Sequence, residues 1–192
     1  MENRIVQCLC VGSIQTNCWI YVNESSNFCA VIDPGAEPGV IISHLKKHGL
    51  KPDYILMTHG HFDHITALPD LLNVFESVSA IHKDDASCLK QKPGRLLDDN
   101  DTIGPFRVIH VPGHTPGCVA FYDEEGGLLF TGDTLFCADC GRTDLAGGSQ
   151  EQLENSLKKL LSMKGNIRVL PGHGPETTIK QEAARGIGFF VD

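Results

Sequence analysis

Short apolar runs separated by turn residues recur along most of the chain, and most of them predict β-strands. Two longer segments instead have the period of an amphipathic helix: residues 38–48, which Gly49 ends, and residues 149–163. Ser149 and Gln152 match a capping box, and a third helix is expected to begin at Thr178. The expected strands cover residues 4–11, 18–22, 28–33, 54–58, 106–111, 118–122, 128–132 and 168–170.

Hairpin-like strand pairs mixed with helices indicate an α/β (α+β) fold in which two layered sheets carry helices on the outside. The 192 residues are enough for one domain with a hydrophobic core and leave little room for a second. We therefore expect a single domain over residues 1–192, with no internal repeat or linker.

Composition and charge narrow the function classes. The chain is 41% hydrophobic and 21% charged, as in ordinary soluble domains, and its net charge of -8 disfavours binding to nucleic acid or to an anionic membrane. Polar residues interrupt the apolar stretches of the first 22 residues, which predict neither a signal peptide nor a spanning helix. We expect a cytoplasmic protein that acts on a small molecule. The oligomeric state is not predicted.

The eight cysteines would suggest disulfides only in a secreted chain. Without a secretory signal, reduced and buried thiols that act as small hydrophobic side chains are expected at Cys8 and Cys10, on one face of a predicted strand, and at Cys18, Cys29 and Cys118, in apolar runs. Cys137 and Cys140 form a C-x-x-C pair, but one pair is only half the ligand set of a structural zinc site. The role of this pair is left open.

The strongest chemical signal directly follows the strand at 54–58, where residues 58–64 read T-H-G-H-F-D-H. If the backbone leaves the strand in an extended loop, His59 and His61 point the same way, because side chains alternate with period two. A helix starting near Asp63 would turn Asp63 and His64 to the other side. One turn of chain could then serve two metal ions.

Three further candidates occupy similar positions, since His114, Asp133 and His173 each follow an apolar strand and a glycine. Strand ends of this kind converge on one pocket in many proteins. Imidazole and carboxylate ligands without thiolate suit zinc, with iron or manganese as alternatives. The sequence therefore predicts two divalent metal ions that share a bridging hydroxide.

These residues resemble the metallo-β-lactamase superfamily. Residues 58–64 match its T-H-x-H-x-D-H motif in full. P-G-H-T-P-G at 112–117, T-G-D-T-L-F at 131–136 and P-G-H-G at 171–174 are similar to its later motifs, so the resemblance covers about Val11 to Thr178. It implies an αβ/βα sandwich of two mixed β-sheets flanked by helices. It also implies that one metal is held by His59, His61 and His114, the other by Asp63, His64 and His173, with Asp133 as the bridge.

Within the superfamily, T-G-D-T-L-F followed by C-G-R-T-D resembles the glyoxalase II branch of hydroxyacylglutathione thioesterases. The resemblance implies that Arg142 contacts the carboxylate of glutathione. Two features depart from that branch: Gly174 and Pro175 replace the residues that include its tyrosine after the last histidine, and only 14 residues follow Thr178, in place of its C-terminal helical domain.

The leading hypothesis is hydrolysis of a thioester, or of a related ester or lactone, with Asp63 orienting the hydroxide and moving its proton. One alternative is a persulfide dioxygenase with a single iron held by His59, His114 and Asp133, a facial triad suited to oxygen chemistry. A metal-binding module without catalysis is the third.

Several other polar residues lie outside the predicted ligand set. His44, His48 and His82 are interpreted as surface residues, and His110 as at most a support for a ligand. Asp33 either orients a ligand histidine or forms a turn before Pro34. The hydroxyl of Thr58 is expected to support the ligand loop.

Overall fold

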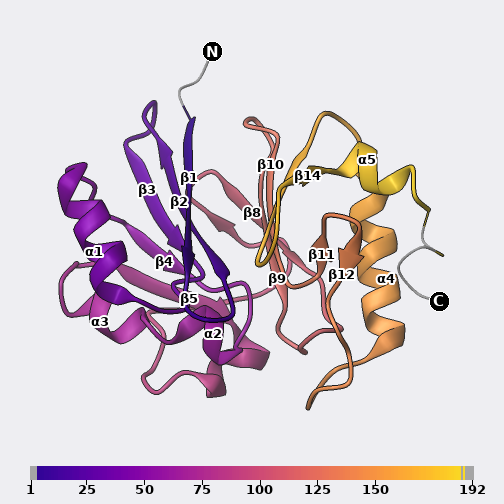
Figure 1. Cartoon of the computed structure of the whole chain (residues 1–192), viewed down its shortest axis with the longest axis horizontal. Helices are drawn as coiled ribbons and strands as arrows, with labels where there is room; N and C mark the ends of the chain where they lie inside the picture. Colours follow the sequence, from indigo (N-terminus) through magenta and orange to yellow (C-terminus); the bar gives the residue numbers. More distant parts are fainter. Residues whose placement is uncertain (1–3, 187, 189–192) are drawn as a thin grey trace.

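The computed structural model describes residues 4–186 and 188, which form two six-stranded sheets with helices on their outer faces (Figure 1). The first sheet has the order β1-β2-β3-β4-β5-β6. Strands β1 to β3 pair antiparallel with their neighbours, and β3 to β6 pair in parallel. Its strands are β1 Arg4–Val11, β2 Thr16–Asn23, β3 Phe28–Ile32, β4 Tyr54–Leu56, β5 Val78–His82 and β6 Arg95–Leu97.

The second sheet has the order β14-β13-β10-β9-β8-β7, and only the β10–β13 pair is parallel. A small hairpin of β11 Leu135–Phe136 and β12 Asp139–Cys140 follows β10. Both large sheets are mixed, so the predicted fold class is confirmed. The strands are β7 Thr102–Ile103, β8 Phe106–His110, β9 Val119–Asp123, β10 Leu128–Gly132, β13 Arg168–Pro171 and β14 Thr177–Thr178.

The main core lies between the two sheets. Tyr21 from β2 packs against Phe106 from β8 with ring centroids 4.6 Å apart, and Phe121 and Phe130 are equally buried beside them. Burying a large apolar side chain contributes about 1.5–3 kcal/mol. This aromatic layer joins the sheets and so fixes the position of their strand ends, where the candidate residues lie.

Helices cover the two outer faces. α1 and α3 pack on the first sheet through Ile41, Leu45, Leu68 and Leu71, whereas α4 and α5 cover the second (Figure 1). The predicted starts of α4 and α5 are confirmed, because Ser149 and Thr178 accept hydrogen bonds from backbone amides as N-caps. The helices are α1 Pro38–Lys47, α2 Phe62–Ile65, α3 Leu68–Leu72, the 3₁₀-helix η1 Lys83–Cys88, α4 Gln150–Leu161 and α5 Ile179–Ala183.

Two features differ from the sequence-based expectation. β5 and β6, which complete the first sheet, were not predicted, and neither were α3 and η1. Two cysteines expected to be buried, Cys8 and Cys10, are exposed, because both lie on β1, the edge strand of the first sheet. In the described part of the chain, no helix is long and apolar enough to cross a bilayer.

Candidate metal centre

The seven predicted ligands all lie where strands or their following turns end, at one edge of the sandwich. His59 and His61 follow β4, and Asp63 and His64 belong to the single turn of α2. His114 lies in the turn between β8 and β9, Asp133 directly after β10 and His173 two residues after the end of β13. The ligands at the two extremes of the sequence, His59 and His173, are 114 positions apart. They belong to one cluster because both sheets end at this edge.

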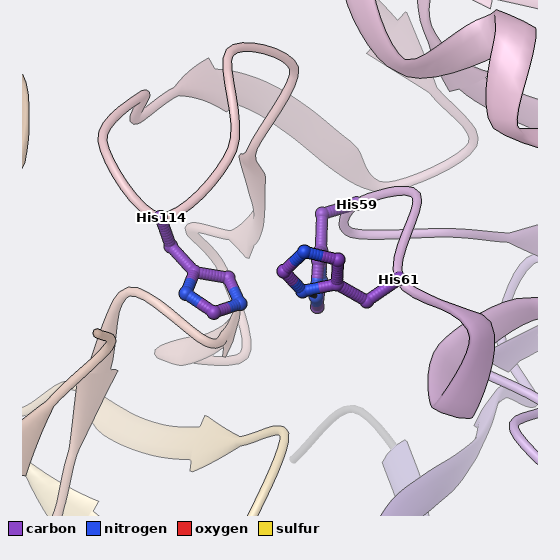
Figure 2. A group of neighbouring side chains, drawn as sticks. All are labelled: His59, His61 and His114. Atoms are coloured by element: carbon purple, nitrogen blue, oxygen red, sulfur yellow. Dashed lines mark hydrogen bonds between the residues drawn. The ribbon is translucent and has the colours of Figure 1, made fainter. Parts of the chain in front are cut away.

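His59, His61 and His114 form the first of two ligand groups (Figure 2). His59 and His61 come from one loop, and His114 faces them from the opposite turn. The Nε2 atom of His59 lies 3.1 Å from Nδ1 of His61, and the His114 ring centroid lies 4.9 Å and 4.5 Å from those of His59 and His61. As expected from the alternation of side chains, the first two rings point the same way.

Asp63, His64 and His173 form the second group. The Nε2 atom of His173 lies 3.3 Å from both Nε2 of His64 and Oδ2 of Asp63. Asp63 and His64 lie on the short helix α2, but the separation that the sequence predicted is incomplete: the ring centroids of His64 and His59 are 4.2 Å apart, and these two histidines also form a group of possible ligands with Asp133.

Asp133 lies between the two groups. Its Oδ2 atom is 3.5 Å from Nε2 of His114 and 3.5 Å from Nε2 of His173, and its Oδ1 atom is 3.4 Å from Nε2 of His64. Gly172 makes this close approach feasible, because a Cβ atom there would lie 2.2 Å from Oδ1 of Asp133. The carboxylate is therefore placed to act as a bridge between two ions.

Hydrogen bonds fix the ring tautomers of two of the histidines. His114 Nδ1 donates to the backbone carbonyl of Arg142 over 2.7 Å, which leaves Nε2 with its lone pair toward the cluster. The single hydroxyl proton of Thr58 goes to Oδ2 of Asp33, so Thr58 accepts from His59 Nδ1 and the lone pair of His59 Nε2 also faces inward. The predicted support of the loop by Thr58 is confirmed.

Asp33 contacts the second ligand group directly, through His64, and the first through Thr58. Besides Thr58, its Oδ2 atom lies 3.0 Å from Nδ1 of His64, a distance at which a carboxylate orients a ligand histidine. Asp33 also has a positive φ of 54° directly before Pro34. The two interpretations made from the sequence therefore both describe this residue.

Burial and the neighbouring carboxylates shift the pKa values of the histidines in this cluster in opposite directions. Burial lowers the pKa of His59 well below its usual value. Burial alone would also lower the pKa of His64, but the carboxylates of Asp133 and Asp33 raise it well above that value. Hydrogen bonds to Asp133 and Asp63 raise the pKa of His173 to about 9, despite burial.

The carboxylates show the complementary effect. Burial alone would raise the pKa of Asp133, but the charge of His64 and the close contacts of His173 and His64 with the carboxylate hold it well below its usual value. Burial would likewise raise the pKa of Asp63, but the hydrogen bond from His173 and the charge of His64 outweigh this effect. The pKa of Asp63 is therefore lowered. The carboxylates are thus kept anionic.

The residues fit two divalent cations. His114 Nε2 and Asp133 Oδ1 are buried polar atoms without a hydrogen-bond partner in the described structure, and both point into the cluster. Buried polar atoms normally have a partner, so these two sites call for one. The donor set of imidazole and carboxylate suits zinc, iron or manganese.

In the metal-free protein, we expect the melting temperature to fall as the pH rises from 6.5 to about 9. The pKa of His173 is raised from 6.5, so its contribution to stability is fully present below pH 6.5 and is lost as the pH passes through about 9. Thermal unfolding with a chelator measures this. The slope should be shallower in His173→Gln; an equal slope in both proteins would contradict the assignment.

Three supporting residues were not predicted. Thr16 donates to Oδ2 of Asp63 over 3.2 Å, while Asn17 and Trp19 both donate over 3.0 Å to the carbonyl of Pro171 and so hold the strand end before His173. The available signal was the position of Thr16 and Asn17, two polar residues directly before the apolar run at 18–22.

The interpretation of His82 as a surface residue was wrong. It is 1% exposed, and its ring stacks on that of His110 at a centroid distance of 4.2 Å. His110 itself contacts the carbonyl of Pro116 rather than a ligand side chain. The adjacent Lys83, Asp84 and Asp85 suggested a surface position, but His82 ends β5, a strand that the sequence did not predict and that lies inside the sheet.

A cavity of about 410 Å³ opens beside the cluster. Its lining includes three candidate ligands, His114, Asp133 and His173, together with residues of the β11–β12 hairpin and Arg142. The guanidinium of Arg142 makes two hydrogen bonds of 2.6 Å to Asp144, and both side chains are exposed. Cys137 and Cys140 line the same cavity.

This fold, with histidine and aspartate ligands at its strand ends, defines a class of metal-dependent hydrolases. The model of the metallo-beta-lactamase superfamily matches residues 11–173, and the chain belongs to that superfamily. The resemblance inferred from the motifs is thereby confirmed.

Two curated relatives are similar over most of their length. The chain is 37% identical over 194 residues to the probable metallo-hydrolase YqgX of Bacillus subtilis, covering 90% of this chain and 91% of the relative. It is 32% identical over 200 residues to the hydroxyacylglutathione hydrolase GloC of Haemophilus influenzae, with coverage of 92% and 94%.

Two solved structures are also similar. The BLEG-1 B3 metallo-beta-lactamase superposes with a TM-score of 0.89 at 34% identity, covering 94% of this chain and 97% of that one. TTHA1623 in a di-iron-bound form superposes with a TM-score of 0.85 at 38% identity, with coverage of 93% and 97%. A related centre therefore holds two metal ions.

Proposed function

We propose that the protein hydrolyses a thioester of the hydroxyacylglutathione type at a centre of two divalent metal ions. The observation that carries this proposal is the cavity of about 410 Å³, which is lined both by candidate ligands, His114, Asp133 and His173, and by the carboxylate-binding side chain of Arg142. The similarity to GloC supports the substrate class. Zinc is the expected metal, with iron and manganese as alternatives.

Two metal ions supply a hydroxide nucleophile at neutral pH and polarise the substrate carbonyl when they are bound. One ion would be held by His59, His61 and His114, and the other by Asp63, His64 and His173. Asp133 would bind both ions. In the reaction, the oxygen of water bonds to the acyl carbon and the carbon–sulfur bond breaks. The products are a carboxylate and the free thiol carrier.

Asp63 is the proposed catalytic residue. Its Oδ2 atom accepts a hydrogen bond from Thr16 and lies 3.3 Å from His173, so the orientation of the carboxylate is fixed at the edge of the cluster. An anionic carboxylate in this position can orient the attacking water and accept its proton. The lowered pKa of Asp63 keeps it in the required charge state.

Arg142 is the proposed contact for the thiol carrier. A guanidinium grips a carboxylate with two parallel hydrogen bonds, and Arg142 already does this with Asp144. That ion pair lowers the pKa of Asp144 to about 2. Both side chains are exposed, so a substrate carboxylate can compete with Asp144 for the same donors.

For Arg142→Ala, we expect KM to rise about tenfold for acylglutathiones, because charge-assisted hydrogen bonds to the carrier are lost. The KM for simple acyl thioesters without a carboxylate should not change. Arg168→Ala is a matched control, since Arg168 is also an exposed arginine paired with a carboxylate, Glu176, and does not line the cavity. Equal effects of Arg142→Ala on both substrate types would show that Arg142 does not bind the carrier.

A second candidate reaction is hydrolysis of a β-lactam or another cyclic ester or amide, because the chain is 34% identical to the BLEG-1 B3 metallo-beta-lactamase. A substrate panel separates the candidates: acylglutathiones, simple thioesters, lactones, β-lactams and a glutathione persulfide. Fastest turnover of acylglutathiones supports the proposal. Oxygen uptake on the persulfide with one iron per chain would instead indicate a dioxygenase, and no turnover of any substrate a metal-binding module.

A further inference from the structure

Asp85 is a buried carboxylate that the account of the metal centre leaves unused. It lies in η1, directly after β5, and is 2% exposed. It belongs to none of the groups of side chains whose ligand atoms lie close enough to share a metal, among the residues that the structure describes. Its role must therefore be sought in what its two oxygen atoms bind.

Both oxygens of Asp85 accept hydrogen bonds from the ligand loops. Oδ2 accepts from the backbone amide of Gly60 over 2.8 Å and from the hydroxyl of Thr115 over 2.6 Å. Oδ1 accepts from the backbone amide of Gly117 over 2.8 Å. All three donors are buried, so these bonds form away from water.

The donors to Asp85 lie in the two loops that supply the first ligand group. Gly60 lies between His59 and His61, and Thr115 directly follows His114. The first loop leaves β4 of one sheet, and the second lies between β8 and β9 of the other. One carboxylate thus joins, from behind, the two loops that supply the first ligand group, and Figure 2 shows these loops facing each other.

Asp85 packs tightly against the loop that contains Gly117. A Cβ atom at Gly117 would lie 2.5 Å from Cγ of Asp85, so any larger residue there would displace the carboxylate. A backbone hydrogen bond of 2.8 Å from Val119 to the carbonyl of Thr58 also connects the loops, but it lies at the strand ends. Asp85 is the contact made beside the ligands themselves.

We propose that Asp85 is a positioning residue that sets the spacing between the His59–His61 loop and His114, and thereby the affinity of the first ligand group for its metal ion. A ligand set must be held within about 0.5 Å of its productive geometry, and supporting hydrogen bonds provide this. The inference rests on the metal-binding role of the cluster. It does not depend on which substrate the enzyme uses.

The test is metal binding by Asp85→Asn, measured without substrate. The metal-free protein is titrated with zinc in competition with a chromophoric chelator. An amide has the size of the carboxylate, but its NH₂ group must face at least one of the donors, so one contact between the loops is lost. We expect the affinity for one of the two ions to fall about 10- to 100-fold, with the other much less affected.

Asp123→Asn is the matched control for a purely structural effect. Asp123 is 1% exposed and also accepts three hydrogen bonds, from Tyr21, Arg4 and Gly126, at the opposite end of β9. The thermal unfolding of both metal-free variants is measured alongside. We expect Asp123→Asn to lose stability and still bind both ions with wild-type affinity.

Thr115 provides the second pair of variants, which keeps the test valid if Asp85→Asn does not fold. Thr115→Val removes the hydroxyl that donates to Asp85 and should weaken the same ion, whereas Thr115→Ser keeps the donor and should bind as the wild type does. Wild-type zinc affinities in Asp85→Asn and Thr115→Val would overturn the proposal. So would parallel losses of metal in Asp85→Asn and Asp123→Asn that only follow their losses of stability.

Discussion

Asp133→Ala is expected to lose one metal ion and nearly all activity while the protein stays folded. Asp133 is the only described side chain whose carboxylate lies within 3.5 Å of histidines of both ligand groups, so its removal affects both ions at once. The loss of affinity for at least one ion should exceed the 10- to 100-fold that loss of a supporting residue costs. Turnover should then fall by about a thousandfold or more.

Metal content measured by mass spectrometry, together with turnover, checks this prediction. Asp139→Ala is a suitable control, because Asp139 is an exposed acid that lines the same cavity and lies outside the ligand groups. It should keep both metals. An Asp133→Ala protein with two metals and wild-type turnover would refute the bridging position.

Asp63→Asn is expected to lower kcat by about 10²- to 10⁴-fold at saturating metal, the range contributed by general acid–base catalysis. An amide cannot accept the proton of the attacking water, although Thr16 can still donate to its oxygen. KM should change little, because Asp63 does not line the cavity beside Arg142.

The measurement needs added zinc, because metal affinity also falls when an anionic ligand becomes neutral. Thr16→Val serves as a milder variant, since it removes one hydrogen bond to Asp63 and leaves the carboxylate in place. It should reduce kcat less than Asp63→Asn does. A rise in KM alone, with kcat and metal content unchanged, would contradict a catalytic role for Asp63.

The candidate site could be predicted from the sequence because its ligands are concentrated in short motifs at strand ends. The segment 58–64 supplies four of the seven, and period-two alternation correctly placed His59 and His61 together, although His64 also lies close to His59. The principal strands and the helices α1, α4 and α5 were also predictable, since they are apolar runs or carry capping residues.

The supporting residues could not be predicted in the same way, because their roles depend on contacts between distant segments. Asp85 and Gly117 are 32 positions apart, and nothing in either segment indicates that they meet. His82 was misplaced for a related reason: β5 pairs in parallel with both β4 and β6, so its burial comes from neighbours that local polarity does not reveal. Parallel strands require long connections, which hide the pairing from local patterns.

The central claim is that this cluster holds two metal ions, and the metal content of the untreated, purified protein tests it most directly. Mass spectrometry should find about two divalent ions per wild-type chain, as zinc, iron or manganese, in keeping with the two ligand groups that share Asp133. A wild-type protein that binds a single ion, or none, when zinc, iron and manganese are each supplied in excess would contradict it.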